Sequence, residues 1–394
     1  MTLPTFEELL TPHGQAALDA ATLLAPTDAT FLAAFDKLRR RFDPDLAKAA
    51  IETVILRSKA RGKFPDTERL YFEREALEQA TPAAVAGHRA ARLAAFATVL
   101  DLGCGLGADA IALARAGCCV IAVERDPLRA AMAAANFAAL NLPIEVIAAD
   151  ALTMPQLEVD AVFCDPARRD NDTRHLLTDA YTPTPHEVIA RFPQLPIVFK
   201  LAPGIARSDL ARYDGEAEFV SLGGELKECT LWLGGLATVP RRATVLPRGA
   251  TLVGDGVFAE RELSEPKAWV VIPEVAVIRA GLEPQLAEQL GAAFLDSTQP
   301  FLTCGEPPAT PLGQAFRFDA LITGSVSKLT ALLRERGVGR VTWRNFGSPR
   351  DVESVRKAVK LKGDEVRTVV LTRLSDAAAA LVLHPLIISA TSTT

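Results

Sequence analysis

A glycine-rich turn near residue 103 has the residue types best suited to binding a ligand. An apolar run at 97–100 leads into Asp101, glycines follow at 103, 105 and 107, and an alanine-rich stretch covers 110–116. This pattern predicts a strand, a tight turn and a helix, because glycine permits positive φ and close approach of the backbone to a ligand. The first turn of the helix adds unpaired N–H groups. We expect the following residues to bind a nucleotide-like cofactor: Asp101, Gly103, Cys104, Gly105, Gly107 and Asp109.

Two families of cofactor are bound by turns of this kind. Gly103, Gly105 and Ala108 match the dinucleotide pattern G-x-G-x-x-G/A. Asp101 counts against NAD, because a pyrophosphate would meet an anion there. The run 101–107 also resembles motif I of the class I S-adenosylmethionine (SAM)-dependent methyltransferases, and this resemblance implies that Asp101 lies near the methionine end of SAM. A glycine-rich turn without a ligand is the alternative.

Two further acids follow apolar strands. The run 120–124 ends in Glu124, whose carboxylate can accept hydrogen bonds from both ribose hydroxyls of either cofactor, and Arg125 lies beside it. After the run 144–148 comes the pair Asp150 and Ala151. The methyltransferase resemblance implies that this pair caps the adenine. The alternative for both acids is a solvent-exposed loop position.

A third acid, Asp165, begins the sequence Asp-Pro-Ala-Arg-Arg after the apolar run 160–164. It resembles the [Asp/Asn]-Pro-Pro-[aromatic] signature of amino-methyltransferases that act on nucleobases. The resemblance implies that Asp165 and the carbonyl of Pro166 orient the acceptor, so these two and Arg168 are the expected catalytic residues. Arg168 replaces the aromatic residue of the signature, and a guanidinium can stack on a base or hold a phosphate. An acid capping a turn before proline is the alternative.

Composition indicates a multidomain globular protein. The chain has 394 residues, a net charge of −5 and 49% hydrophobic residues. The six cysteines include no C-x-x-C pair, so we expect buried free thiols and no metal site. The first residues do not form a basic-then-apolar signal segment, and the apolar run 377–390 is too short to span a bilayer. We therefore expect a cytoplasmic protein without a membrane association.

Patterns along the chain predict four regions. Residues 1–95 have helical spacing, with helix starts at Asp43-Pro44 and Thr81-Pro82. A polar stretch at 74–80 could fold over the cofactor, but a solvated helix face is the favoured interpretation of its single residues. Residues 96–238 alternate between strand and helix patterns, with a fifth strand at 197–201, which predicts a doubly wound parallel sheet. We interpret Lys200 and Glu228 as solvated strand ends. Residues 239–312 are a mixed connecting region, and 298–313 looks like a proline-rich linker. Residues 313–394 form an α/β domain.

The C-terminal α/β domain contains a basic segment. Residues 325–374 contain 12 Lys and Arg residues against 5 Asp and Glu residues, a net charge of +7. They are predicted to form helix 326–336, strand 340–343, helix 352–359 and strand 366–371. A compact basic α/β module of this kind suits RNA. An ordinary solvated surface that balances the acidic remainder is the alternative.

The whole chain resembles the bacterial class I methyltransferases that have a C-terminal THUMP-like domain. The resemblance rests on the segments 75–80, 101–109, 165–169, 200–204 and 327–340. It implies an α/β fold: a Rossmann-like doubly wound methyltransferase domain, an N-terminal helical region and a C-terminal α/β THUMP-like domain. It also implies SAM as cofactor and, because THUMP domains bind RNA, a tRNA or rRNA substrate. A methyltransferase acting on a small molecule or protein, or a non-catalytic SAM- or RNA-binding protein, remains open.

Overall fold

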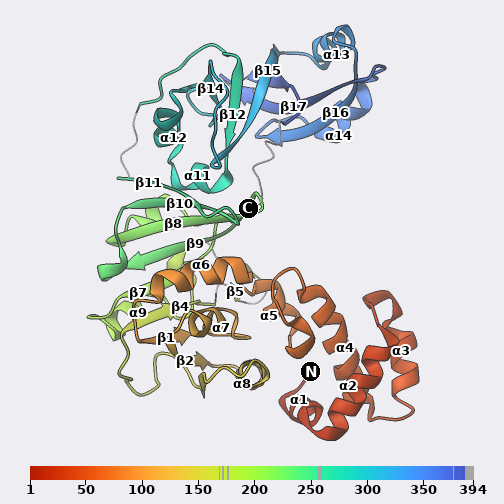
Figure 1. Cartoon of the computed structure of the whole chain (residues 1–394), viewed down its shortest axis with the longest axis vertical. Coiled ribbons are helices and arrows are strands. Elements are labelled where there is room, and N and C mark those ends of the chain that lie inside the picture. Colours follow the sequence, from red (N-terminus) through yellow and green to blue (C-terminus); the bar gives the residue numbers. More distant parts are fainter. Residues whose placement is uncertain (168, 171–172, 175–176, 256–259, 376, 387–394) are drawn as a thin grey trace. The chain divides into compact units, whose positions relative to one another are not determined.

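The computed structural model describes residues 1–394 except 168, 171–172, 175–176, 256–259, 376 and 387–394. The described residues form two compact units. Unit 1 comprises Met1–Glu216 and Lys227–Thr238, and unit 2 comprises Ala217–Leu226 and Val239–Thr394. Figure 1 shows their helices and strands. Among the described residues, no helix combines the length and apolar character that crossing a bilayer requires.

Unit 1 begins with helices, as the sequence predicts. The side chain of Asp43 accepts a hydrogen bond from the backbone N–H of Asp45 and so caps the longest of these helices, whose first residue is Pro44. Phe6, Leu46 and Ile51 are fully buried in their shared core. The six helices are α1 (Leu3–Leu10), α2 (Pro12–Leu24), α3 (Phe31–Leu38), α4 (Pro44–Ala60), α5 (Arg74–Gln79) and α6 (Ala83–Leu93).

A mostly parallel sheet follows in unit 1, with its strands in the order β3-β2-β1-β4-β7-β9. Only β9 runs antiparallel to its neighbour β7 among these described pairs. The strands are β1 (Thr98–Leu102), β2 (Cys119–Glu124), β3 (Glu145–Ala148), β4 (Ala161–Cys164), β7 (Ile197–Leu201) and β9 (Glu225–Leu233). Helices α7 (Ala108–Arg115), α8 (Pro127–Ala139), α9 (Pro185–Arg191) and α10 (Arg207–Leu210) and the short strands β5 (Arg169–Asp170) and β6 (Thr173–Arg174) connect them.

The order of strands in unit 1 places a ligand site beside β1. After β1 the chain continues to β2 and β3 on one side, and then returns to β4 and β7 on the other. Ligands of open α/β sheets bind at such a switch point, outside the carboxyl ends of the strands. The doubly wound, mostly parallel sheet expected from the sequence is confirmed.

Unit 2 contains a seven-stranded sheet in the order β13-β14-β12-β15-β18-β17-β16. Its strands are β12 (Trp269–Pro273), β13 (Ala293–Phe294), β14 (Leu302–Cys304), β15 (Gly313–Thr323), β16 (Val338–Phe346), β17 (Glu365–Leu374) and β18 (Ala377–Leu383). Strands β8 (Gly215–Leu222), β10 (Arg241–Leu246) and β11 (Ala250–Gly254) are neighbours in the order β11-β10-β8. The helices are α11 (Val275–Ala280), α12 (Glu283–Leu290), α13 (Val326–Glu335) and α14 (Val352–Ala358).

The prediction that residues 298–313 form a linker is wrong. Strand β14 lies within this stretch, and Phe301 and Leu302 are fully buried. Strand β12 pairs with both β14 and β15, so residues on both sides of position 313 share one sheet. The two helices and two strands expected in the basic segment are confirmed as α13, β16, α14 and β17.

Candidate active site

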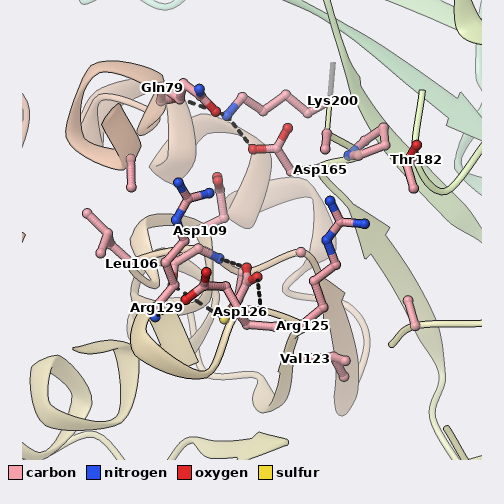
Figure 2. A pocket seen from close by; sticks show the side chains of 18 of the residues that line it. Gln79, Leu106, Asp109, Val123, Arg125, Asp126, Arg129, Asp165, Thr182 and Lys200 are labelled. Carbon is pink, nitrogen blue, oxygen red and sulfur yellow. Dashed lines mark hydrogen bonds and ion pairs between the residues drawn. The ribbon is translucent and has the colours of Figure 1, made fainter. Parts of the chain in front are cut away.

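A cavity in unit 1 lies at the switch point of the sheet and brings most of the expected site residues together (Figure 2). The expected residues that line it are Gly103, Cys104, Gly105, Asp109, Glu124, Arg125, Asp150, Ala151, Asp165 and Pro166. Asp101 and Gly107 do not line it. Arg168 lies outside the described residues.

The three glycines of the turn after β1 all have positive φ, but their surroundings differ. A Cβ on Gly103 would lie 2.6 Å from the carbonyl oxygen of Asp165, and one on Gly107 would lie 2.3 Å from the ring of Phe137. A Cβ on Gly105 would meet no protein atom within 4 Å. Gly103 and Gly107 therefore permit close packing, whereas Gly105 leaves open space on the cavity wall.

We expect Gly105→Val to abolish binding of SAM, because the branched side chain would occupy that space. Gly117→Val is the matched control: Gly117 also has positive φ and open surroundings, but it does not line the cavity. Both variants carry backbone strain, so both should lose stability. Calorimetry should detect SAM binding only to the wild type and the Gly117 variant. Normal binding by the Gly105 variant would show that the cofactor does not contact this turn.

Glu124, the last residue of β2, is fixed by hydrogen bonds from two backbone N–H groups. Its Oε2 accepts a hydrogen bond from the backbone N–H of Gly105, and its Oε1 accepts one from that of Asp126, both at 2.9 Å. Two charge-assisted bonds fix the carboxylate at the cavity wall. This geometry fits a carboxylate that binds a ribose diol.

Two other expected residues lie farther along the cavity wall. Asp150 is exposed, and its Oδ1 accepts a 2.8 Å hydrogen bond from the backbone N–H of Leu152. Arg125 is also exposed and is drawn beside the cavity in Figure 2. Both residues follow the carboxyl ends of neighbouring strands, Arg125 after β2 and Asp150 after β3.

Asp101 is fully buried, and neither of its carboxylate oxygens has a hydrogen-bond partner among the described residues. Burial, together with the charges of Asp109 and Asp165, raises the pKa of Asp101 well above its ordinary value. The raised pKa favours the neutral form of Asp101, and a cation bound nearby would favour its charged form. The described residues that line the cavity include five acids and three bases. The excess of acidic side chains around the cavity therefore fits a cofactor with a sulfonium and an ammonium group better than one with a pyrophosphate.

A buried ion network that sequence reasoning missed is centred on Arg89. The guanidinium of Arg89, on α6, bonds to both Asp109 and Glu228, and lies over the ring of Phe163. Thr81, expected to begin a helix, instead donates a 2.9 Å hydrogen bond to Asp109 while α6 begins at Ala83. Glu228 is 2% exposed, so its interpretation as a solvated strand end is wrong.

The charges of this network support one another. Burial disfavours the charged form of Asp109, but the charges of Arg89 and Lys200, together with the hydrogen bonds from Arg89 and Thr81, outweigh it and hold the pKa of Asp109 below its ordinary value. The pKa of Arg89 is likewise raised, because Asp109 and Glu228 outweigh the effect of its burial. The signal for Arg89 in the sequence is its place in the apolar spacing of α6, alongside Val85, Ala86, Ala90 and Leu93. The network ties α6 to the first turn of α7 at the cavity.

Asp165 and Lys200 form an ion pair at the carboxyl ends of β4 and β7. Lys Nζ lies 2.7 Å from Oδ2 of Asp165 and 3.4 Å from the backbone oxygen of Gln79. Figure 2 shows the ammonium between these two partners. Lys200 is 4% exposed, so its interpretation as a solvated strand end is also wrong. A buried ammonium needs such partners because its desolvation is costly.

The polar stretch 74–80 does lie beside the cavity, as the sequence suggested. It forms α5, and Ala76, Gln79 and Ala80 line the cavity wall. Arg129 of α8 binds Glu73 at 2.7 Å and Glu75 at 3.5 Å. At the other end of α5, Lys63 donates to the backbone oxygens of Leu77 and Glu78 at 2.7 and 2.6 Å. Together these contacts hold α5 at both of its ends.

Three family models match parts of the chain. A domain of unknown function matches residues 2–60, a methyltransferase domain matches residues 99–182, and a THUMP-like domain matches residues 313–385. The second match covers β1 to β4 and the residues that follow, and hence most of the cavity.

Relatives and solved structures extend these matches over nearly the whole chain. An uncharacterized SAM-dependent methyltransferase of Mycobacterium tuberculosis, found in strains H37Rv and CDC 1551, is 32% identical over 347 residues. The match covers 86% of this chain and 95% of that protein. A solved structure from Porphyromonas gingivalis W83, named as a methyltransferase, has a TM-score of 0.75 and 21% identity, and covers 96% of this chain and 98% of that one. The likeness to the Porphyromonas gingivalis structure shows a shared fold alone.

Proposed function

The chain belongs to the SAM-dependent methyltransferases, and from this premise we propose that it methylates a nucleotide in RNA, either a tRNA or an rRNA. Its cofactor is SAM, which supplies an activated methyl group on a sulfonium. The observation that carries the RNA proposal is the charge of the THUMP-like domain. Residues 325–374 have a net charge of +7 in a chain whose total is −5.

Eight of the twelve basic side chains in residues 325–374 fall into two groups. Arg336 and Arg367 bind Asp319, and Arg344 donates to Gln314, so these three contribute to the fold of unit 2. The second group is exposed and forms no ion pair with the described residues: Lys328, Arg340, Lys357, Lys360 and Lys362. A set of exposed, unneutralised cations is what a phosphate backbone attracts.

We assign the cavity residues to two roles. On the cofactor side, the backbone of Gly105 leaves space for SAM, Glu124 accepts from its ribose, and Asp150 and Ala151 lie at its adenine. Gly103, Cys104 and Asp109 line the same wall, and Asp101 and Gly107 support it without lining it. On the acceptor side, Asp165 and the carbonyl of Pro166 accept hydrogen bonds from the reacting group, so that its lone pair faces the methyl group. Arg168, outside the described residues, would hold the base or a phosphate. Alignment of this kind provides most of the rate enhancement in a methyl transfer.

The proposal is tested by methyl transfer in vitro. Purified protein and SAM with a labelled methyl group are incubated separately with total RNA, with a protein extract and with a small-molecule extract from cells that lack the gene. We expect label in RNA alone. Label in either other extract would favour the alternative substrates, and label in none would favour a binding protein without catalysis.

We expect the exposed lysines of the THUMP-like domain to control the salt dependence of RNA binding. The variant with Lys357, Lys360 and Lys362 changed to Gln should bind RNA more weakly. Its log–log slope of affinity against salt should fall by roughly 0.7–0.9 for each phosphate that the variant no longer neutralises. SAM affinity should not change, because none of the three lines the cavity. The measurement is a series of RNA titrations between low and physiological salt.

A second triple variant provides the control. Lys37, Arg40 and Lys48 are equally exposed but belong to the N-terminal helical region. Changing them to Gln removes the same charge, and we expect it to leave the slope unchanged. Equal slopes for both variants would show that the C-terminal charge is ordinary surface charge.

A further inference from the structure

One carboxylate oxygen of Asp165 accepts a hydrogen bond from the described residues, and the other accepts none. Its Oδ2 accepts the 2.7 Å hydrogen bond from Lys200, whereas Oδ1 accepts none from the described residues. The side chain of Asp165 is 25% exposed, and that of Lys200 is 5% exposed. Both residues line the cavity, but the side chain of Asp165 is the more exposed of the two.

The same ammonium also reaches a second segment that lines the cavity. Lys200 lies 3.4 Å from the backbone oxygen of Gln79, at the C-terminal end of α5. One buried cation thus joins Asp165, which follows β4, to the end of α5. The 2.7 Å charge-assisted hydrogen bond from Lys200 restrains the rotamer of Asp165.

From these contacts we propose that Lys200 is a positioning residue for methyl transfer: it holds Oδ2 of Asp165 and leaves Oδ1 to accept a hydrogen bond from the methyl acceptor. The inference rests on the role proposed above for Asp165. It requires no contact between Lys200 and either substrate or cofactor.

The test is a double-mutant cycle on the rate of methyl transfer, with Lys200→Met and Asp165→Ala alone and together. Methionine keeps the length of the side chain and removes its charge. A hydrogen bond to a charged group corresponds to roughly a 10- to 150-fold change in rate, so Lys200→Met should lower kcat by about that factor. KM for SAM should stay within about threefold. In the Asp165→Ala background, Lys200→Met should lower kcat by less than about twofold.

Lys63→Met is the matched control. It removes the other lysine that binds the end of α5, but it has no contact with Asp165. Its effect should be the same in the wild-type and Asp165→Ala backgrounds. Independent, multiplicative effects of Lys200→Met and Asp165→Ala would overturn the proposal, because Lys200 would then act elsewhere than through Asp165.

The free energy of unfolding provides a readout that does not need a substrate. If Lys200 and Asp165 form their ion pair, the double variant should lose less stability than the sum of the losses of the two single variants. Additive losses would overturn the proposal. A wild type that transfers no methyl group to RNA would overturn the proposed function instead, while the stability cycle would still decide on the pair. If the Lys200→Met variant does not bind SAM, the double-mutant cycle on methyl transfer is measured with Lys200→Gln in its place, and the same outcomes apply.

Discussion

Asp165→Ala is expected to lower methyl transfer by about 10²- to 10⁴-fold, the range typical of a positioned acid–base group. The affinity for SAM should change little, because the role proposed for Asp165 is toward the methyl acceptor and its ion pair is with Lys200. Single-turnover rates and calorimetry measure the two effects separately. Asp160→Ala is a suitable control, since Asp160 is an exposed aspartate just before the opposite end of β4.

Asp165→Asn distinguishes an orienting role from that of a base. An amide oxygen still accepts a hydrogen bond from an amine, so methylation of an amine should partly survive this change. An acceptor that must be deprotonated would lose its base, and the rate should fall as far as in the alanine variant. If neither variant slows the transfer, Asp165 is a structural turn residue and the likeness of 165–169 to the amino-methyltransferase signature is misleading.

Arg89→Met is expected to have the largest effect on stability. It leaves the carboxylates of Asp109 and Glu228 buried without their cation, and breaking a buried ion pair in this way costs about 3–5 kcal/mol. The measurement is denaturant unfolding followed by circular dichroism. We expect weaker SAM binding as well, because Asp109 lines the cavity.

Arg39→Met is the matched control for this variant. Arg39 pairs with Asp36 at 2.9 Å, but both side chains are more than half exposed. Such a surface pair contributes about 0–1 kcal/mol, so the control should unfold almost like the wild type. A loss for Arg89→Met as small as that of the control would contradict a network that stabilises the fold.

Strands β1, β2 and β4 could be predicted from the sequence because each is a short, mostly buried apolar run with an acid at or just after its carboxyl end. Asp101 lies within β1, Glu124 ends β2 and Asp165 follows β4. The glycines of the first turn fitted either cofactor family, and Asp101 before them favoured SAM over NAD. Only the structure shows that Gly105 is the one of these three glycines with open space around it.

Contacts between distant segments could not be predicted in this way. Arg89 and Glu228 are 139 residues apart, and Lys200 and Gln79 are 121 residues apart. Their pairing depends on which strand lies beside which helix, so a charged residue at a strand end looks solvated in the sequence. The same limit applies to β14, whose three residues are too few to show an alternating pattern among the neighbouring prolines.

Mass spectrometry of nucleosides tests the central claim of RNA methylation most directly. tRNA and rRNA from a strain without the gene are digested and compared with those from strains that carry the wild type or Asp165→Ala. The account predicts that one methylated nucleoside is absent without the gene, returns with the wild type and does not return with Asp165→Ala. Identical nucleoside profiles in all three strains would contradict it.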